Sequence, residues 1–213
     1  MQFYGYFRSS ASYRCRIAFG LKGLAPDFHG VHLRRAEHRR EGYLALNPQG
    51  LVPTLEVEGH ALTQSLAIIE WLDETYPEPA LLPKDAFVRA EVRAFAQAIA
   101  CDIHPLNNLR VLAYLKSPLG HSQDEVDAWY RHWCDEGLAP LERIAAARSD
   151  RGAFSFGDLP SLADICLVPQ LANARRFGCD LTRYPRLGDI EAACNVLPAF
   201  AAARPELQPD AEA

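Results

Sequence analysis

The sequence has no apolar run long enough to cross a bilayer. The stretch LAIIEWLDE, residues 66–74, is interrupted by Glu70 and Asp73, and the other apolar runs are shorter, whereas a membrane helix needs about 20 consecutive apolar residues. The opening residues, MQFYGYF, show no basic segment followed by a long apolar stretch, so no secretory signal is expected. Both absences favour a cytoplasmic protein with no membrane partner.

An excess of positive charge is also missing. Lysine and arginine number 22 against 27 aspartates and glutamates, which gives a formal net charge of -5. Because phosphate binding needs a basic surface, this balance argues against nucleic acid as the main partner. Individual arginines can still bind small acids.

Cysteine is present, but in no metal-binding pattern. The six cysteines form no CxxC pair and no Cys/His spacing of a metal site, so no metal is expected. In a reducing compartment they are expected to be small buried hydrophobic side chains, and Cys15 to lie in the core rather than act as a nucleophile. The six are Cys15, Cys101, Cys134, Cys166, Cys179 and Cys194.

The first 80 residues alternate between strand and helix patterns, as in a small α/β domain. Tyr13, Ile17 and Leu21 recur every four residues, as on one helix face, and Lys22 and Gly23 form a stop signal. The expected order is a strand at 2–6, a helix ending near 22, an extended stretch at 28–33, a helical segment at 37–46, strands at 51–57 and 61–63, and a helix at 65–76 capped by Ser65.

A proline-rich segment, YPEPALLPKD, marks a linker, and the pattern after it is helical. We therefore expect an α/β domain at 1–80, a linker at 81–86 and an all-helical domain at 87–213. The tail QPDAEA, residues 208–213, is expected to be disordered.

Two helices in the second half carry clear start signals. Ser122 with Glu125, and Ser161 with Asp164, have the spacing of capping boxes. The helix after Ser122 has an apolar and aromatic stripe that is expected to be core rather than a cofactor site. Its members are Val126, Trp129, Tyr130, Trp133, Leu138 and Leu141.

The stretch FRSSASYRCRIAFGLKG, residues 7–23, places Arg8, Ser9 and Ser10 where a strand gives way to a helix. One serine suffices as an N-cap, because its hydroxyl accepts a hydrogen bond from an otherwise unpaired backbone N–H. Alternatively, the helix start is an anion site, and a hydroxyl held there donates to a ligand's thiolate. The local sequence leaves both interpretations open.

Two more candidate contacts follow other elements of the same small sheet. Val52 precedes Pro53, and proline is unusual just inside a strand because it has no N–H. A trans bond would make this an ordinary strand start, whereas a cis bond would leave the peptide groups of Val52 open to an extended peptide ligand. Gln64 and Ser65 place an amide at a helix N-terminus, which suits a ligand carboxylate.

Six segments, in order along nearly the whole chain, resemble the zeta class of glutathione transferases, the family of the maleylacetoacetate and maleylpyruvate isomerases. They are FRSSASYRCRIAFGLKG, NPQGLVPTL, LTQSLAIIEWL, CDIHPLNNLRVLAYL, GDLPSLADICLVPQLANARRF and DLTRYPRL. The resemblance implies a thioredoxin-like N-terminal α/β domain that binds glutathione, an all-α C-terminal domain, a homodimer and no metal.

The resemblance also implies the residues that contact the cofactor. Ser9 lies beside the glutathione sulfur, with Ser10 next to it. The tripeptide backbone pairs with Val52 before a cis Pro53. Gln64 and Ser65 hold the γ-glutamyl end of glutathione. The positions that border the glutathione or substrate site are His38, His104 and Asn108.

The side chains that we expect to bind the carboxylates of a substrate are Arg8, Arg110 and Arg176, because a guanidinium combines a planar fork with a permanent charge. Arg39 and Arg131 are instead expected to be solvated surface charges. On a straight helix His104 and Asn108 would share a face and Arg110 would point elsewhere, although Pro105 could bend that helix.

The resemblance, together with these residues, implies a glutathione-dependent cis–trans isomerase of aromatic degradation, which converts a maleyl keto-diacid to its fumaryl isomer. A general glutathione transferase or dehalogenase, and a non-catalytic binding protein of the same fold, are the alternatives. Ala11 replaces the family's cysteine, Tyr13 its usual tryptophan or histidine, and Leu51 a common polar contact, so affinity and rate are in question more than reaction type. The sequence does not choose between maleylacetoacetate and maleylpyruvate.

Overall fold

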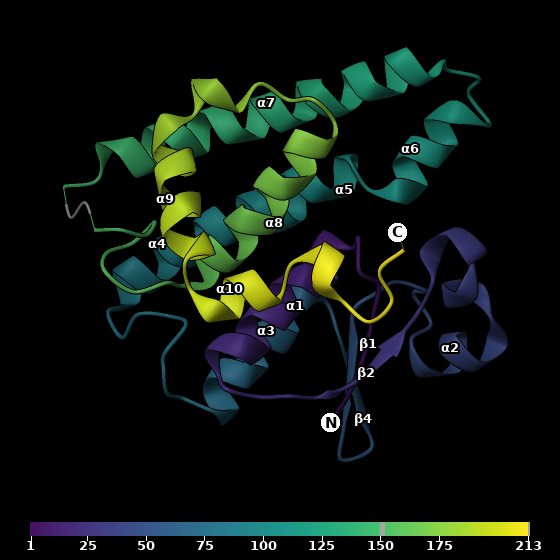
Figure 1. Cartoon of the computed structure of the whole chain (residues 1–213), viewed down its shortest axis with the longest axis horizontal. Coiled ribbons are helices and arrows are strands. Elements are labelled where there is room, and N and C mark those ends of the chain that lie inside the picture. Colours follow the sequence, from purple (N-terminus) through teal and green to yellow (C-terminus); the bar gives the residue numbers. More distant parts are fainter. Residues whose placement is uncertain (150–151, 213) are drawn as a thin grey trace. The chain divides into compact units, whose positions relative to one another are not determined.

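The computed structural model describes residues 1–149 and 152–212 and contains two compact units (Figure 1). One unit is Met1–Leu81 together with Asn195–Ala213, and the other is Leu82–Cys194. The first division lies next to the linker expected at 81–86. The second differs from the expected helical domain at 87–213, because the chain after Cys194 returns to the first unit.

Close helix packing accounts for this return. Helix α10 (Pro198–Ala202) lies along α1 (Ser10–Leu21), as Figure 1 also shows. A β-carbon added at Gly20 would lie 3.1 Å from Ala199, so the missing side chain lets the two helices approach closely. Phe200 of α10 is fully buried. The apolar face of α10 therefore belongs to the core of the first unit.

The first unit is built on a four-stranded sheet in the order β2-β1-β3-β4. Strand β1 (Gln2–Gly5) pairs in parallel with β2 (Asp27–Gly30) and antiparallel with β3 (Thr54–Val57), which pairs antiparallel with β4 (His60–Thr63). Phe3 and Leu55 from the sheet are buried with Ile17 of α1 and Ile68 of α3 (Ser65–Thr75). The expected thioredoxin-like α/β architecture is confirmed.

Several local predictions in this unit are confirmed and two need correction. Ser9 is the N-cap of α1, and Gly23 adopts a left-handed φ of 66° after the helix ends. Ser65 is not a cap: it is the first residue of α3, and Gln64 occupies the N-cap position without a side-chain capping bond. The helical segment expected at 37–46 is divided at Arg40 into a 3₁₀ turn, Glu37–Arg39, and α2 (Glu41–Leu46).

The second unit is helical, as expected. Its helices are α4 (Ala86–Gln97), a π-helical segment (Ala98–Ile103), α5 (His104–Leu106), α6 (Leu109–Lys116), α7 (Gln123–Ala147), α8 (Leu162–Arg176) and α9 (Pro185–Asn195). Other 3₁₀ turns in the chain are Leu33–Arg35, Leu181–Arg183 and Pro205–Leu207. Both predicted capping boxes are present, at the starts of α7 and α8.

The predicted core of this unit is largely confirmed. Of the α7 stripe, Val126, Tyr130, Leu138 and Leu141 are buried, whereas Trp129 and Trp133 are half-buried. Of the six cysteines, Cys101 is exposed and Cys179 is half-buried, so the prediction of uniform burial is wrong for these two. Cys15 is fully buried, as expected. Among the described residues, no helix has the length and apolar character to cross a membrane.

Gly137 allows α7 to pack against the segment that precedes His104. A β-carbon there would lie 2.1 Å from Cγ1 of Ile103, a distance that no small adjustment relieves. We expect Gly137→Ala to lower the free energy of unfolding by about 1–3 kcal/mol, as overpacking does, measured by chemical denaturation. Gly188→Ala in α9 is the matched control, because its β-carbon meets nothing within 4 Å. The control should be neutral or gain up to about 1 kcal/mol, and equal losses in both variants would contradict the packing argument.

Candidate functional site

One end of the sheet collects residues from distant parts of the sequence. Tyr4 pairs with Thr54, and Thr54 pairs with Thr63, so these three residues form the last row across β1, β3 and β4. Beyond this row β1 leads to Ser9, β3 is preceded by Val52–Pro53, and β4 leads to Gln64. The strand register thus brings the three predicted contact segments to the same edge.

Ser9 fills the capping role and keeps a hydroxyl proton for the other role that the sequence left open. Its Oγ accepts a hydrogen bond from the Ser12 N–H at 3.2 Å, so the serine is a genuine N-cap. A capping hydroxyl uses a lone pair and keeps its own O–H, which can donate to a second partner. Ser9 is half-buried, and Ser10 behind it is buried. The start of α1 can therefore present one hydroxyl donor and a positive helix end to an anion.

The bond between Val52 and Pro53 is cis, which decides between the two alternatives. Val52 precedes the first paired residue of β3, Thr54, and within the described chain its N–H and C=O have no hydrogen-bond partner. The turn before it is fixed from inside, because Leu51 O accepts from Tyr43 Oη at 2.6 Å and from Asn47 Nδ2 at 2.8 Å. Val52 thus offers a donor and an acceptor on a rigid support, as β-type pairing with a peptide requires.

Gln64 and Ser65 open α3 with an unusual backbone. Gln64 has a φ of 70° and a ψ of 119°, a conformation that is costly for a residue with a β-carbon and that clusters at ligand sites. The exposed amide of Gln64 is steadied by a bond from its Nε2 to Gln49 Oε1 at 3.2 Å. The N-terminus of α3 therefore faces the same edge as that of α1.

Arg14 is a functional candidate that the sequence analysis missed. This arginine of α1 is 1% exposed, and its Nη1 donates to Ser65 Oγ at 3.3 Å. Its Nε and Nη2 are buried without a hydrogen-bond partner, and among the described residues no carboxylate lies within ion-pair distance. Because Ser65 Oγ accepts from Arg14, the Ser65 O–H is left to donate outward. A buried cation behind a helix N-terminus reinforces that terminus as an anion site.

His38 and Arg8 lie on the loops that leave the same sheet edge. Desolvation and the neighbouring Arg39 cation lower the pKa of His38 below its usual value, so its ring is neutral at pH 7. Its Nδ1 is buried and has no hydrogen-bond partner in the part of the chain that the structure describes. The Arg8 guanidinium lies 5.1 Å from the centre of the Phe7 ring, in a cation–π contact.

In the second unit, His104 and Asn108 are in contact, but not on one helix face. Helix α5 ends at Leu106, and Asn108 caps α6 by accepting from the Arg110 N–H at 3.1 Å. Since that bond uses Asn108 Oδ1, Nδ2 is the atom that faces His104 Nε2, at 3.3 Å. The Asn108 amide thus donates to the ring of His104 in the tautomer that leaves Nε2 unprotonated.

The interruption of the helix between Leu106 and Leu109 corrects the expectation of one helix running through Arg110. Arg110 lies in the first turn of the new helix α6, and its side chain is exposed. Arg176 is the last residue of α8, also exposed, with its guanidinium 5.1 Å from the Phe177 ring centre. The Phe177 ring in turn stacks on the Tyr130 ring, with 3.7 Å between the two ring centres. Arg39 and Arg131 are exposed, as expected.

Comparisons with known proteins agree with this arrangement. The family model of the glutathione S-transferase N-terminal domain matches residues 3–80, and that of the C-terminal domain matches residues 127–203. The maleylpyruvate isomerase of Ralstonia sp is 49% identical over 210 residues, 99% of each chain. A solved holo maleylpyruvate isomerase, described as a bacterial zeta-class glutathione transferase, has a TM-score of 0.98 at 48% identity over 100% of both chains.

This chain belongs to the zeta class of glutathione transferases. A second solved relative, a maleylacetoacetate isomerase from Anaeromyxobacter dehalogenans with dicarboxyethyl glutathione and citrate in its active site, has a TM-score of 0.86 at 43% identity. The match covers 99% of this zeta-class transferase and 93% of that chain. The predicted family and the predicted order of a thioredoxin-like domain and a helical domain are confirmed.

Proposed function

We propose that this zeta-class transferase is a glutathione-dependent cis–trans isomerase of a maleyl keto-diacid, maleylacetoacetate or maleylpyruvate. The observation that carries the proposal is the start of α1, where the Ser9 hydroxyl and the helix N-terminus face the edge that also holds Val52 and Gln64. A free thiol has a pKa of about 8.5, so a hydroxyl donor and a helix dipole are needed to favour the thiolate at neutral pH.

The reaction follows from the chemistry of a thiolate. The glutathione sulfur adds to one carbon of the cis double bond, and the π electrons move onto the conjugated carbonyl as an enolate. The former double bond is now single and rotates. The enolate electrons then re-form the bond in the trans geometry and expel the thiolate, so that glutathione is regenerated and acts as a cofactor.

The residues around the sheet edge have distinct proposed roles. Ser9 donates to the thiolate, supported by Ser10; Val52 next to Pro53 pairs with the tripeptide backbone; Gln64 and Ser65 bind the γ-glutamyl carboxylate. His38, His104 and Asn108 are proposed as further contacts with glutathione or substrate. The test is a spectroscopic isomerisation assay on both keto-diacids with glutathione or S-methylglutathione. Turnover that persisted with S-methylglutathione, which has no free thiol, would exclude the addition mechanism.

Arg8, Arg110 and Arg176 are the proposed ligands of the substrate carboxylates and the developing enolate. We expect Arg176→Ala to reduce kcat/KM for a maleyl diacid by roughly ten- to over a hundredfold, because a charge-assisted hydrogen bond is lost. Conjugation of glutathione to a neutral electrophile should stay nearly unchanged. Arg176→Lys should recover only part of the activity, since it restores the charge without the fork.

Arg131→Ala is the matched control for this variant, because Arg131 is another exposed arginine of the same unit and should leave both activities intact. Equal losses on the neutral and dianionic substrates would favour the second candidate function, a general glutathione transferase or dehalogenase. That outcome would mean that Arg176 stabilises the fold or binds the cofactor rather than the substrate.

We further propose that the protein is a cytoplasmic homodimer. Some large apolar side chains are exposed, including Phe87 of α4, which is 84% exposed. Exposed apolar side chains of this kind suit a subunit interface. Light scattering at micromolar concentration should give twice the 23.7 kDa chain mass. A monomer mass across that range would refute the dimer.

A further inference from the structure

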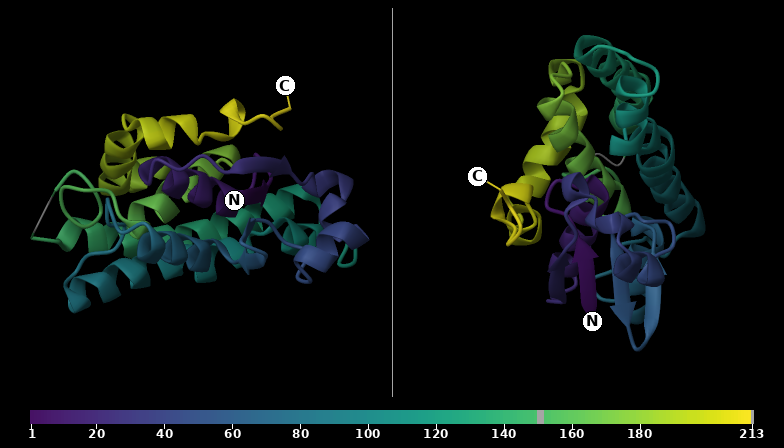
Figure 2. Two further views of the ribbon diagram at one scale, coloured as in Figure 1. Left: turned by 90° about the horizontal axis from the view of Figure 1, so that it is seen from below. Right: turned by 90° about the vertical axis from the view of Figure 1, so that its right-hand side faces the viewer.

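The C-terminal tail, Ala203–Glu212, is ordered, and this corrects the expectation of disorder from residue 208; Ala213 lies outside the described residues. Both views of Figure 2 show the yellow end of the chain beside its purple beginning. Asp210 Oδ2 accepts a hydrogen bond from the Phe7 N–H at 2.9 Å. The tail therefore reaches the residue that precedes Arg8 and Ser9.

The carbonyl of Phe7 is also hydrogen-bonded, by the positively charged side chain of Arg16. Arg16 Nη2 donates to Phe7 O at 3.1 Å, and Arg16 Nε donates to Ala203 O at the start of the tail, at 3.0 Å. Burial lowers the pKa of Arg16 to about 10, partly offset by the Asp210 carboxylate, so the guanidinium stays charged at pH 7. Asp210 and Arg16 thus fix both backbone polar groups of one residue, Phe7, and so hold the peptide groups on either side of its Cα.

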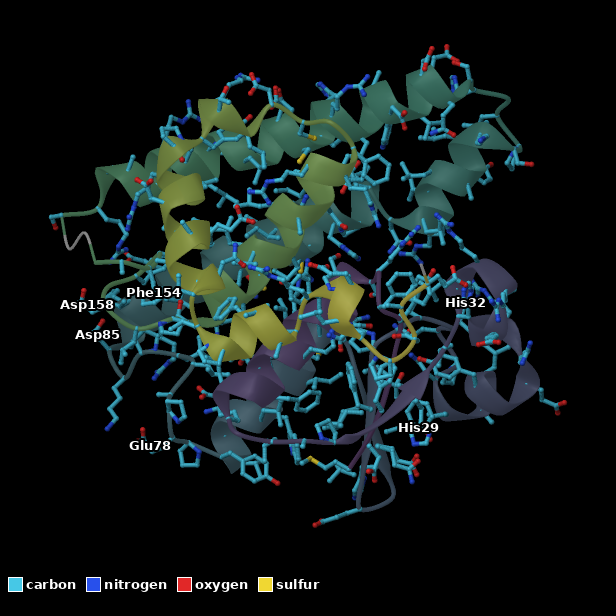
Figure 3. All side chains as sticks on the ribbon, in the orientation of Figure 1. His29, His32, Glu78, Asp85, Phe154 and Asp158 are labelled. Carbon is cyan, nitrogen blue, oxygen red and sulfur yellow. The ribbon has the colours of Figure 1, made fainter. Side chains whose placement is uncertain are left out.

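Two further contacts hold the tail at this place. Glu212 Oε1 lies 2.8 Å from His32 Nε2 and 3.1 Å from Arg35 Nη2, and Figure 3 labels His32. A β-carbon added at Gly30 would lie 3.3 Å from the Asp210 Cβ, so the side chain of Asp210 passes close over the end of β2. The position of its carboxylate is therefore set by packing on the sheet as well as by hydrogen bonds.

The next link runs from Phe7 to Ser9. The Ser9 N–H donates to Tyr6 O at 2.9 Å, and the Ser9 Oγ accepts from the Ser12 N–H. Phe7 lies between Tyr6 and Ser9 in the chain, so the orientation of its backbone sets the position of the Ser9 hydroxyl at the helix start. We propose that Asp210 is a positioning residue that, together with Arg16, fixes the backbone of Phe7 and so directs the Ser9 hydroxyl toward the thiolate.

This role rests on the proposed function of Ser9, and its test measures thiolate formation separately from isomerisation. Asp210→Ala leaves the Phe7 N–H without its acceptor. We expect it to raise the pKa of enzyme-bound glutathione, followed by the ultraviolet absorbance of the thiolate, and to lower kcat roughly ten- to a hundredfold, as small misplacements in an active site do. The Kd of glutathione by calorimetry should change little, because Val52 and Gln64 are untouched.

Asp210→Asn keeps an oxygen that can accept from Phe7 and should restore most of the kcat and of the thiol pKa. Glu206→Gln, an exposed tail position, is the matched control and should behave as wild type. The proposal is wrong if Asp210→Ala leaves the thiol pKa unchanged, or if Asn fails to rescue while both variants lose thermal stability equally. If the wild type lowers the thiol pKa of glutathione but isomerises no maleyl diacid, the proposed function fails and the role of Asp210 stands.

Discussion

Ser9→Ala should lower turnover by about 10²-fold or more while leaving the Kd of glutathione within a fewfold of wild type. The reason is that the hydroxyl is proposed to act on the thiolate, whereas the tripeptide is proposed to bind through Val52 and Gln64. Loss of one preorganised donor to a developing anion has effects of this size. Steady-state kinetics with a maleyl diacid gives the turnover, and calorimetry with glutathione gives the Kd, on the same preparation.

The N-cap role of Ser9 requires two controls, because removal of the Ser9–Ser12 bond also costs about 1 kcal/mol of stability. Ser9→Gly lacks the hydroxyl but loses only a few tenths of a kcal/mol as a cap, so it should match Ala in turnover and not in stability. Ser122→Ala removes the cap of α7 and should lose stability without losing activity. Unchanged turnover in Ser9→Ala would move the role to Ser10 or to the helix terminus alone.

Arg14→Met should weaken glutathione binding by roughly ten- to a hundredfold and at the same time raise the free energy of unfolding of the ligand-free protein by about 1 kcal/mol or more. The two effects have opposite signs because Arg14 is a buried cation with no carboxylate partner among the described residues. Its desolvation is unfavourable until a carboxylate binds at Ser65, where we propose that the γ-glutamyl group lies, whereas a methionine of similar length packs there without that cost. Calorimetric titration and chemical denaturation measure the two quantities.

Lys22→Met is the matched contrast, since Lys22 is also a buried cation of the same unit. Its Nζ donates to Asp73 Oδ1 at 2.7 Å and to the carbonyls of Tyr76 and Pro79, both at 2.6 Å. Removing it leaves the Asp73 carboxylate without its counter-charge, so we expect a loss of about 3–5 kcal/mol and little change in glutathione affinity. If Arg14→Met destabilised the protein as Lys22→Met does and left the Kd unchanged, Arg14 would be a structural residue only.

Local patterns in the sequence were enough to predict much of the fold. The N-cap at Ser9, the helix stop at Gly23 and both capping boxes depend on residues within four positions of one another, and they formed as predicted. The strand and helix order needed only hydrophobic periodicity and turn residues. The motif at Arg8–Ser10, with the segments that resemble the zeta class, was enough for the family and the class of chemistry.

Other features depended on contacts that no local pattern encodes. Arg14 and Ser65 are 51 positions apart, and Phe7 and Asp210 are 203 apart, so the burial of one and the ordering of the other follow from helix and sheet packing. The tail looked disordered because its composition is polar and acidic. It is ordered because its carboxylates accept a hydrogen bond from a backbone N–H and pair with a histidine and an arginine of the sheet domain. The sequence by itself thus determined which chemical groups are present and where helices begin, and the tertiary structure alone decided which charges are buried, paired or left for a ligand.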